Sequence, residues 1–167
     1  MRLRICHLYP DLLNLYGDRG NVLILYQRAV WRGIRAEVDP ISVHDRVRFS
    51  DYDIIFLGGG ADQEQRLVSR DMEKKGPLLV EAAEDGVVIL SICGGFQLLG
   101  RYYRSRDGSV LPGVGVFDVY TEAGEKRLKG NILLESSREL QEEMASYNPL
   151  APSTLLGFEN HSGRTFL

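Results

Sequence analysis

The sequence predicts an α/β fold in which helices cover a doubly wound, mostly parallel sheet. Residues 52–57 and 87–92 are short, continuous apolar runs, which are typical of parallel strands buried on both faces. A segment of helical character separates the two apolar runs, and glycines follow the first run directly and the second run after Cys93. We therefore expect an open sheet whose ligands bind at the carboxyl ends of its strands.

The first element is a strand over residues 2–9, where apolar and polar side chains roughly alternate. Pro10, Gly17 and Gly20 then indicate a loop, in which Asp18 reads as a helix-capping or turn residue. An amphipathic helix begins at Asn21 and ends before Gly33. Its apolar positions are Val22, Leu25, Tyr26, Ala29 and Val30.

Residues 34–43 alternate in polarity and predict a second strand, and residues 52–57 predict a third that ends in three glycines. Residues 61–86 are charged and compatible with a helix. Gly76 and Pro77 predict a break there, with Pro77 in the first turn of a second helix. The strand over residues 87–92 leads straight into Cys93.

Beyond Gly100 the pattern changes to strand-like runs over residues 113–122, 126–137 and 153–163. Residues 136–149 predict a solvated helical or flexible insertion. At 167 residues with 44% hydrophobic side chains, the chain has the size of a single domain over residues 1–167.

Composition excludes several classes of protein. The 20 Lys and Arg residues against 23 Asp and Glu give a net charge of -3, which argues against nucleic-acid binding. No stretch has the length of a signal peptide's apolar region or of a membrane span, so we expect a cytoplasmic protein. Two cysteines without zinc-site spacing are expected to be free thiols, with no metal bound.

The stretch LSICGGFQLLG places Cys93 where a buried strand turns into a helix. Such a turn brings the residues two positions away on either side into close contact, and here they are the small residues Ser91 and Gly95. A thiol at the start of a helix is also favoured as thiolate by the helix dipole. We interpret Cys93 as a nucleophile, against the alternative that it is a small buried hydrophobic residue.

The backbone N–H of Gly94 would donate to an oxyanion formed at Cys93. A second donor would come from the Gly58–Gly60 loop, at the end of the neighbouring strand. The other thiol, Cys6, lies within an apolar strand and is expected to serve only packing.

The motifs LNLYGDRGN, FLGGGADQEQ, SICGGFQLLG, RLKGNI and GFENHSGRT together resemble one family over nearly the whole chain. It comprises the GatD-type glutaminase subunits of lipid II isoglutaminyl synthase, within the cobyric-acid-synthase-like class I glutamine amidotransferases. The resemblance implies a flavodoxin-like fold and a glutamine-hydrolysing activity that starts at Cys93.

The resemblance also implies roles for further residues. Gly94 and Gly60 would hold the oxyanion, Arg127 would contact the glutamine substrate, and Gln65 would lie in the substrate pocket, unless it is a polar residue on an exposed helix face. The ammonia would pass to a Mur-ligase-like partner of the MurT type, which amidates D-glutamate in the peptidoglycan precursor. No cofactor is implied for this subunit, since ATP and Mg are expected only in the ligase.

The catalytic histidine of such proteins lies downstream of the segment that matches GFENHSGRT, and nothing in this chain matches it. Three interpretations stay open. The chain lacks the C-terminal part that carries the base, or His161 serves as the base, or the fold is a binding or regulatory module without turnover. His7 reads as a strand or core residue and His44 as a solvated loop residue, so neither is a convincing base.

The alternatives to a glutaminase subunit are a non-catalytic interaction domain of the same fold, an amidotransferase of the cobyric-acid-synthase type, and a stand-alone cysteine hydrolase that needs no partner. Ammonia release with and without a ligase partner would separate them.

Overall fold

The computed structural model describes residues 1–15 and 17–167, which divide into two compact units. The first unit comprises Met1–Ala123 and Arg164–Leu167, and the second unit comprises Gly124–Gly163. The prediction of a single domain over residues 1–167 stays a prediction.

The first unit contains a four-stranded sheet in the order β2-β1-β3-β4, with every pair parallel, as the sequence predicted. Its strands are β1 (Arg2–Leu8), β2 (Arg35–Ile41), β3 (Ile54–Leu57) and β4 (Val88–Ser91). Pro40 lies in β2, at the edge of the sheet, where its missing N–H costs no ladder hydrogen bond. Leu57 pairs with Ser91, so β3 and β4 end side by side.

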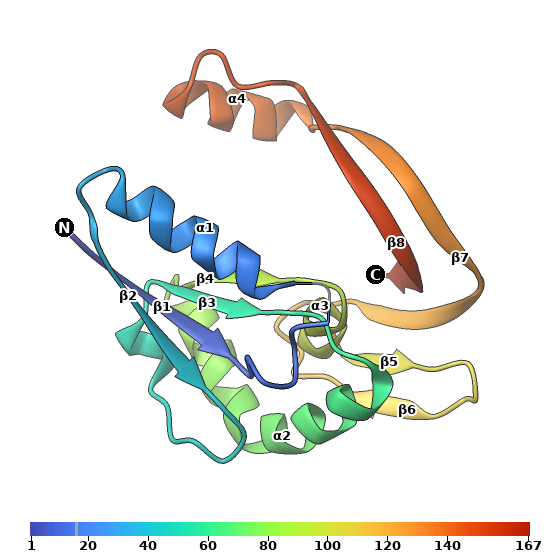
Figure 1. The fold of residues 1–167 in the computed structure, drawn as a ribbon. Coiled ribbons are helices and arrows are strands. Elements are labelled where there is room, and N and C mark those ends of the chain that lie inside the picture. The colour runs from blue at the N-terminus through green and yellow to red at the C-terminus, as the bar shows by residue number, and fades with distance from the viewer. Residues whose placement is uncertain (16) are drawn as a thin grey trace. The chain divides into compact units, whose positions relative to one another are not determined.

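Helices α1 (Arg19–Val30) and α2 (Asp62–Glu84) cover opposite faces of this sheet (Figure 1). On the α1 face, Val22 packs with Ile5 and Phe56. On the α2 face, the buried cluster is larger and holds most of the core. It includes Leu8, Ile55, Leu57, Val68, Met72, Leu79 and Leu98. The sheet is therefore held between two apolar layers, which is the doubly wound arrangement expected from the sequence.

The helix predicted from Asn21 is confirmed, but the predicted apolar stripe is only partly buried. Val22 and Ala29 are buried, whereas Tyr26 and Val30 are 38% and 43% exposed. The stripe is wider than the sheet can cover, because apolar side chains surround much of α1.

Helix α2 corrects the prediction of a break at Gly76 and Pro77, since it runs unbroken from Asp62 to Glu84 with Pro77 inside it. Val68 and Met72 before the proline, and Leu79 and Ala82 after it, are buried in the same core. Packing on both sides therefore outweighs the hydrogen bond that proline removes.

A buried polar network ties α2 to the first strand and the loop after β2. The Asp71 carboxylate accepts hydrogen bonds from Lys75 Nζ at 2.6 Å and from the Tyr9 hydroxyl at 2.9 Å. Lys75 Nζ also donates to the Ser42 carbonyl at 2.8 Å. Burial alone would raise the pKa of Asp71, but the bonds from Lys75 and Tyr9 outweigh it and hold that pKa below its usual value.

Replacing Asp71 with asparagine is expected to destabilise the protein by about 3–5 kcal/mol, because Lys75 would keep a buried charge without its partner. In the parent, the pKa of Asp71 is higher in the unfolded chain than in the folded protein. As pH falls below about 4, the unfolded chain therefore binds a proton at Asp71 before the folded protein does. Stability is therefore lost below pH 4. Urea unfolding of both proteins between pH 3 and pH 7 checks this, and an asparagine variant as stable as the parent at pH 7 would contradict it.

The remaining elements lie outside the first sheet. They are the 3₁₀ turn η1 (Phe49–Asp51), α3 (Gly94–Leu99), β5 (Tyr102–Arg104), β6 (Val110–Pro112), β7 (Tyr120–Glu135), α4 (Arg138–Tyr147) and β8 (Thr154–Phe166). Strands β6, β5, β7 and β8 form a second sheet in that order. No helix within the described part of the chain is both long and apolar enough to span a bilayer.

Helix α4, in the second unit, confirms the helical alternative predicted for residues 136–149. Ser137 caps it, because the Ser137 hydroxyl accepts a hydrogen bond from the Leu140 N–H at 3.2 Å.

Candidate active site

Cys93 lies at the turn between β4 and α3, in a backbone conformation that few side chains adopt. Its φ of 51° and ψ of -110° fall outside the usual regions for a residue with a Cβ. Such strain costs about 1–3 kcal/mol and concentrates at functional sites. The Cys93 side chain is exposed and forms no disulfide. The turn therefore presents the thiol at the carboxyl end of β4, as the sequence predicted.

The turn needs glycine on the helix side of Cys93. A Cβ added at Gly95 would lie 2.7 Å from the carbonyl oxygen of Gly58 and 2.9 Å from the Leu57 Cβ. Both distances are too short for a real side chain, which confirms that the second residue after Cys93 has to be small. A Cβ at Gly94 would likewise meet Gln65 Nε2 at 2.7 Å.

The Gly58–Gly60 loop contacts the turn directly. A Cβ at Gly59 would lie 3.2 Å from the Cys93 Cβ and 3.8 Å from its Sγ. The Gly95 N–H donates to the Gly58 carbonyl at 3.0 Å and so joins the two segments. The pairing of β3 with β4 brings the loop and the thiol to the same edge of the sheet.

The segment that precedes α1 packs against the same loop. The sequence did not predict this contact. A Cβ at Gly58 would lie 2.0 Å from the Leu13 carbonyl oxygen and 2.7 Å from the Asp18 Cβ. The Leu15 N–H donates to the Gly59 carbonyl at 3.0 Å. Leu13, Leu15 and Asp18 of the LNLYGDRGN motif therefore support the site loop. Tyr16 of the same motif lies outside the described residues.

Of the two expectations for Asp18, a helix-capping residue or a turn residue, the structure supports the turn residue. It precedes α1 but makes no side-chain capping bond there, and its side chain is 2% exposed against Gly58. Asn14 takes the capping place instead, because its Oδ1 accepts from the Arg19 N–H at 3.0 Å.

The two thiols differ sharply in environment. Cys6 lies on β1, the strand between β2 and β3, and is fully buried in the core. Burial raises the pKa of its thiol to about 12. Cys6 therefore stays a thiol at neutral pH, as expected of a packing residue. Cys93 is exposed at the sheet edge.

Alkylation of the folded protein at pH 8 is expected to modify one thiol per chain, Cys93, because iodoacetamide needs an accessible thiolate. Unfolding in guanidinium should expose Cys6 and raise the count to two. Intact-mass and peptide mass spectrometry measure both values. Labelling of Cys6 before Cys93 in the folded protein would contradict this assignment.

Gln65 lies in the first part of α2, against the loop and the turn. Its side chain is 3% exposed, and its Nε2 donates to the Gly60 carbonyl at 2.9 Å. The alternative of an exposed helix face is therefore wrong for Gln65. Its contact with a substrate stays a prediction.

Four of the predicted site residues, Cys93, Gly94, Gly60 and Gln65, thus meet at one place in the first unit. Arg127 belongs to the second unit, where its Nε donates to Asn160 Oδ1 at 2.7 Å. His161 also lies in the second unit, with its Nδ1 2.9 Å from the Gly163 carbonyl oxygen. Their roles in catalysis stay predictions.

The other histidines have the surroundings expected from the sequence. His7 is 5% exposed, stacks edge-on with Phe56, and has its pKa lowered by burial. The side chain of His44 is 86% exposed.

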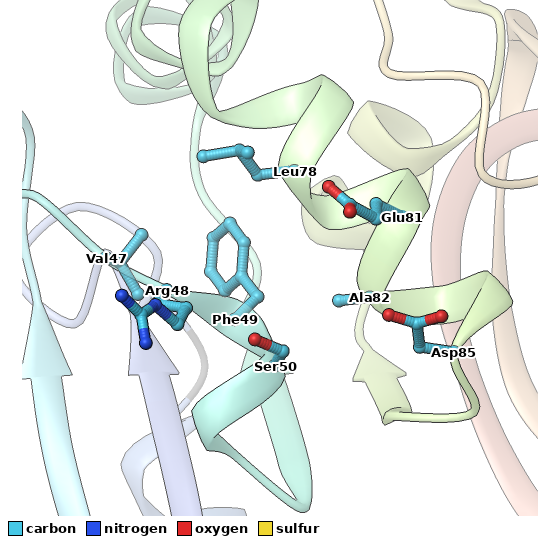
Figure 2. A pocket seen from close by; sticks show the side chains of 8 residues that line it. All are labelled: Val47, Arg48, Phe49, Ser50, Leu78, Glu81, Ala82 and Asp85. Atoms are coloured by element: carbon cyan, nitrogen blue, oxygen red, sulfur yellow. The ribbon is translucent and has the colours of Figure 1, made fainter.

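A separate concavity lies at the opposite edge of the sheet, between η1 and the end of α2. Figure 2 shows Phe49 and Leu78 within it, with Arg48 on one side and Asp85 on the other. Its residues precede β3 and β4, whereas Cys93 follows β4, so it is distinct from the thiol site. In the described ranges, no three His, Cys, Asp or Glu side chains gather as a metal site requires.

Comparison with known proteins gives the class that this fold and site define. Residues 4–167 match the CobB/CobQ-like glutamine amidotransferase domain, so the chain belongs to that family. The lipid II isoglutaminyl synthase (glutamine-hydrolyzing) subunit GatD of Staphylococcus aureus (strain N315) is 43% identical over 164 residues. The GatD subunit of Streptococcus pneumoniae (strain ATCC BAA-255 / R6) is 39% identical over 166 residues.

These alignments cover 98% and 99% of this chain but only 62% and 60% of the two GatD proteins. The chain thus spans about three-fifths of the length of these relatives. A probable cobyric acid synthase of Methanopyrus kandleri is more distant, at 29% identity over 89% of this chain and 32% of that protein.

Proposed function

We propose that the protein is the glutaminase subunit of a lipid II isoglutaminyl synthase and that Cys93 is its nucleophile. One observation carries the proposal: an exposed thiol on a strained turn touches a glycine loop, in a chain of the glutamine amidotransferase family. The identity to two GatD subunits supports lipid II as the acceptor system.

In the proposed reaction, the Cys93 sulfur attacks the carbon of the glutamine side-chain amide. The carbonyl oxygen becomes an oxyanion, held by the backbone N–H groups of Gly94 and Gly60. When the C–N bond breaks, the thiol proton ends on nitrogen and ammonia leaves, so that a glutamyl thioester remains. Water then adds to the thioester, which releases glutamate and restores the thiol.

The proposal assigns substrate contacts to Arg127 and Gln65. A guanidinium such as that of Arg127 suits the α-carboxylate of glutamine, because it can donate two parallel hydrogen bonds. Gln65 Oε1, which is buried without a hydrogen-bond partner among the described residues, suits an N–H of the substrate. The proton is best carried by a histidine, either His161 or one in a further segment of the protein.

We further propose that the ammonia is used by a Mur-ligase-like subunit of the MurT type in a cytoplasmic heterodimer. ATP and Mg belong to that ligase, and this subunit needs no cofactor. Two cysteines that form no disulfide suit a reducing compartment.

Ammonia release from glutamine, measured with the full protein alone and with its ligase partner, tests the proposal. Release that depends on Cys93 and amidates lipid II in the complex is the expected result. Release without any need for the ligase would favour a stand-alone hydrolase. Docking without release in either case would favour a non-catalytic module and overturn the proposal.

A further inference from the structure

The three carbonyl groups of the Gly58–Gly60 loop are each held from a different part of the fold. Gly58 accepts from the Gly95 N–H at 3.0 Å, and Gly59 accepts from the Leu15 N–H at 3.0 Å. Gly60 accepts from Gln65 Nε2 at 2.9 Å. The first two donors are backbone groups, so Gln65 is the one side chain among the three.

A planar trans peptide points its N–H opposite to its C=O, so a donor that fixes a carbonyl also fixes the N–H of the next residue. Leu15, by holding the Gly59 carbonyl, orients the Gly60 N–H. Gln65 fixes the following peptide plane, on the other side of the Gly60 Cα. Glycine has the widest choice of backbone angles, and without both restraints the Gly60 N–H would be free to turn.

The Gln65 side chain contacts both halves of the site. Its Nε2 lies 2.9 Å from the Gly60 carbonyl and would meet a Cβ on residue 94 at 2.7 Å. The helical position of Gln65 is fixed, because its own N–H donates to the Ala61 carbonyl at 2.9 Å. A rigid helix therefore supports the loop through a buried amide.

Gln65 is an unfavourable residue to bury for packing alone. Its Oε1 has no hydrogen-bond partner among the residues that the structure describes, and an unsatisfied buried acceptor costs about 1–3 kcal/mol. An apolar side chain of similar length would avoid that cost. The advantage of Gln65 at this position is therefore the N–H donor of its side-chain amide.

We propose that Gln65 is a positioning residue, which holds the Gly60 carbonyl and so restricts rotation at the Gly60 Cα, with the result that the Gly60 N–H on the preceding peptide stays aimed at the oxyanion formed on Cys93. This inference rests on the proposed glutaminase function. It assigns to Nε2 a role separate from any substrate contact of Oε1.

Gln65→Met tests the proposal in the full protein with its ligase partner, because methionine keeps the length of the side chain and removes the donor. Gln63→Met is the matched control, since Gln63 is exposed on the same turn of α2. For Gln65→Met, kcat for ammonia release is expected to fall about tenfold to a hundredfold, below the loss from removing an oxyanion donor outright. The melting temperature should stay close to the parent value, and KM should rise because methionine also removes the Oε1 proposed to contact the substrate. Gln63→Met should match the parent throughout.

Two measurements separate positioning from a general disturbance of the site. Alkylation of Cys93 by iodoacetamide forms no oxyanion, so its rate should stay within about twofold of the parent in Gln65→Met. In Gln65→Glu, the neutral acid can donate to Gly60 and the carboxylate cannot, so the ratio of variant to parent kcat should rise as pH falls. The positioning role would be overturned if alkylation of Cys93 in Gln65→Met slowed as much as kcat. It would also be overturned if the ratio of Gln65→Glu to parent kcat did not change with pH.

Hydrogen exchange gives a readout that does not depend on turnover. If the parent releases no ammonia, the proposed function fails, and the loop itself still reports on Gln65. Amide exchange in residues 59–61 is expected to be about tenfold faster or more in Gln65→Met than in Gln63→Met. Equal exchange, or full kcat in Gln65→Met, would show that Gln65 does not position the loop.

Discussion

Replacement of Cys93 with alanine is expected to lower glutamine hydrolysis by at least about a thousandfold, since the reaction has no route to the thioester without the sulfur. The measurement is kcat/KM for ammonia release in the full protein. Cys6 cannot take over, because it is fully buried and its pKa is raised to about 12. Retained turnover in this variant would remove Cys93 from the mechanism.

The control for this prediction is stability. Cys93 is exposed, so its loss removes little packing, and the alanine variant should unfold at nearly the parent temperature. Cys93→Gly should be more stable than Cys93→Ala, because glycine relieves the strain of a φ of 51°. A lower melting temperature for the glycine variant would contradict the strained turn.

Gly95→Ala is expected to destabilise the protein by about 2–3 kcal/mol and to abolish glutamine hydrolysis. The new methyl group would lie 2.7 Å from the Gly58 carbonyl oxygen and 2.9 Å from the Leu57 carbonyl oxygen. Backbone atoms at both contacts cannot rotate away, so the loop and the turn would have to separate. Chemical unfolding and ammonia release measure the two effects.

Gly20→Ala is the matched control, since it makes the same change within α1, where no described atom beyond the chain neighbours and the helix's own backbone lies within 4 Å of the new Cβ. This variant should gain about 0.5–1 kcal/mol from the better helix propensity of alanine and keep full activity. Equal stability of the two variants would mean that the contact at Gly95 is looser than described.

The parts of the fold that the sequence predicted are those set by local pattern. The apolar run that became β3 is buried on both faces, as predicted. The run that became β4 does form a strand, but the prediction of burial on both faces is wrong for it, because β4 lies at the edge of the sheet and leaves Val88 and Leu90 58% and 38% exposed. The turn at Cys93 followed from the small residue Gly95 in the strand-to-helix context. Because β3 and β4 are neighbours in the sheet, the Gly58–Gly60 loop after β3 lies beside Cys93 after β4, and the order of the strands was enough to predict this.

The parts that the sequence did not predict depend on contacts between distant segments. Pro77 reads as a helix break, but core packing by Met72 and Leu79 on either side keeps α2 continuous. Asp18 reads equally well as a cap or as a turn residue, and its contact with Gly58 could not be predicted because the sequence does not show which loops pack against each other. The role of Gln65 could not be predicted for the same reason, because only its burial in the folded protein distinguishes a supporting amide from a solvated one.

The most direct test of the account is the covalent intermediate. The full protein with its ligase partner is mixed with glutamine, quenched in acid during turnover and digested for mass spectrometry. We expect the peptide that carries Cys93 to gain the mass of one glutamyl group, and the Cys93→Ala protein to gain none. Ammonia release without an adduct on Cys93, or an adduct on Cys6 instead, would contradict the proposal that Cys93 is the nucleophile.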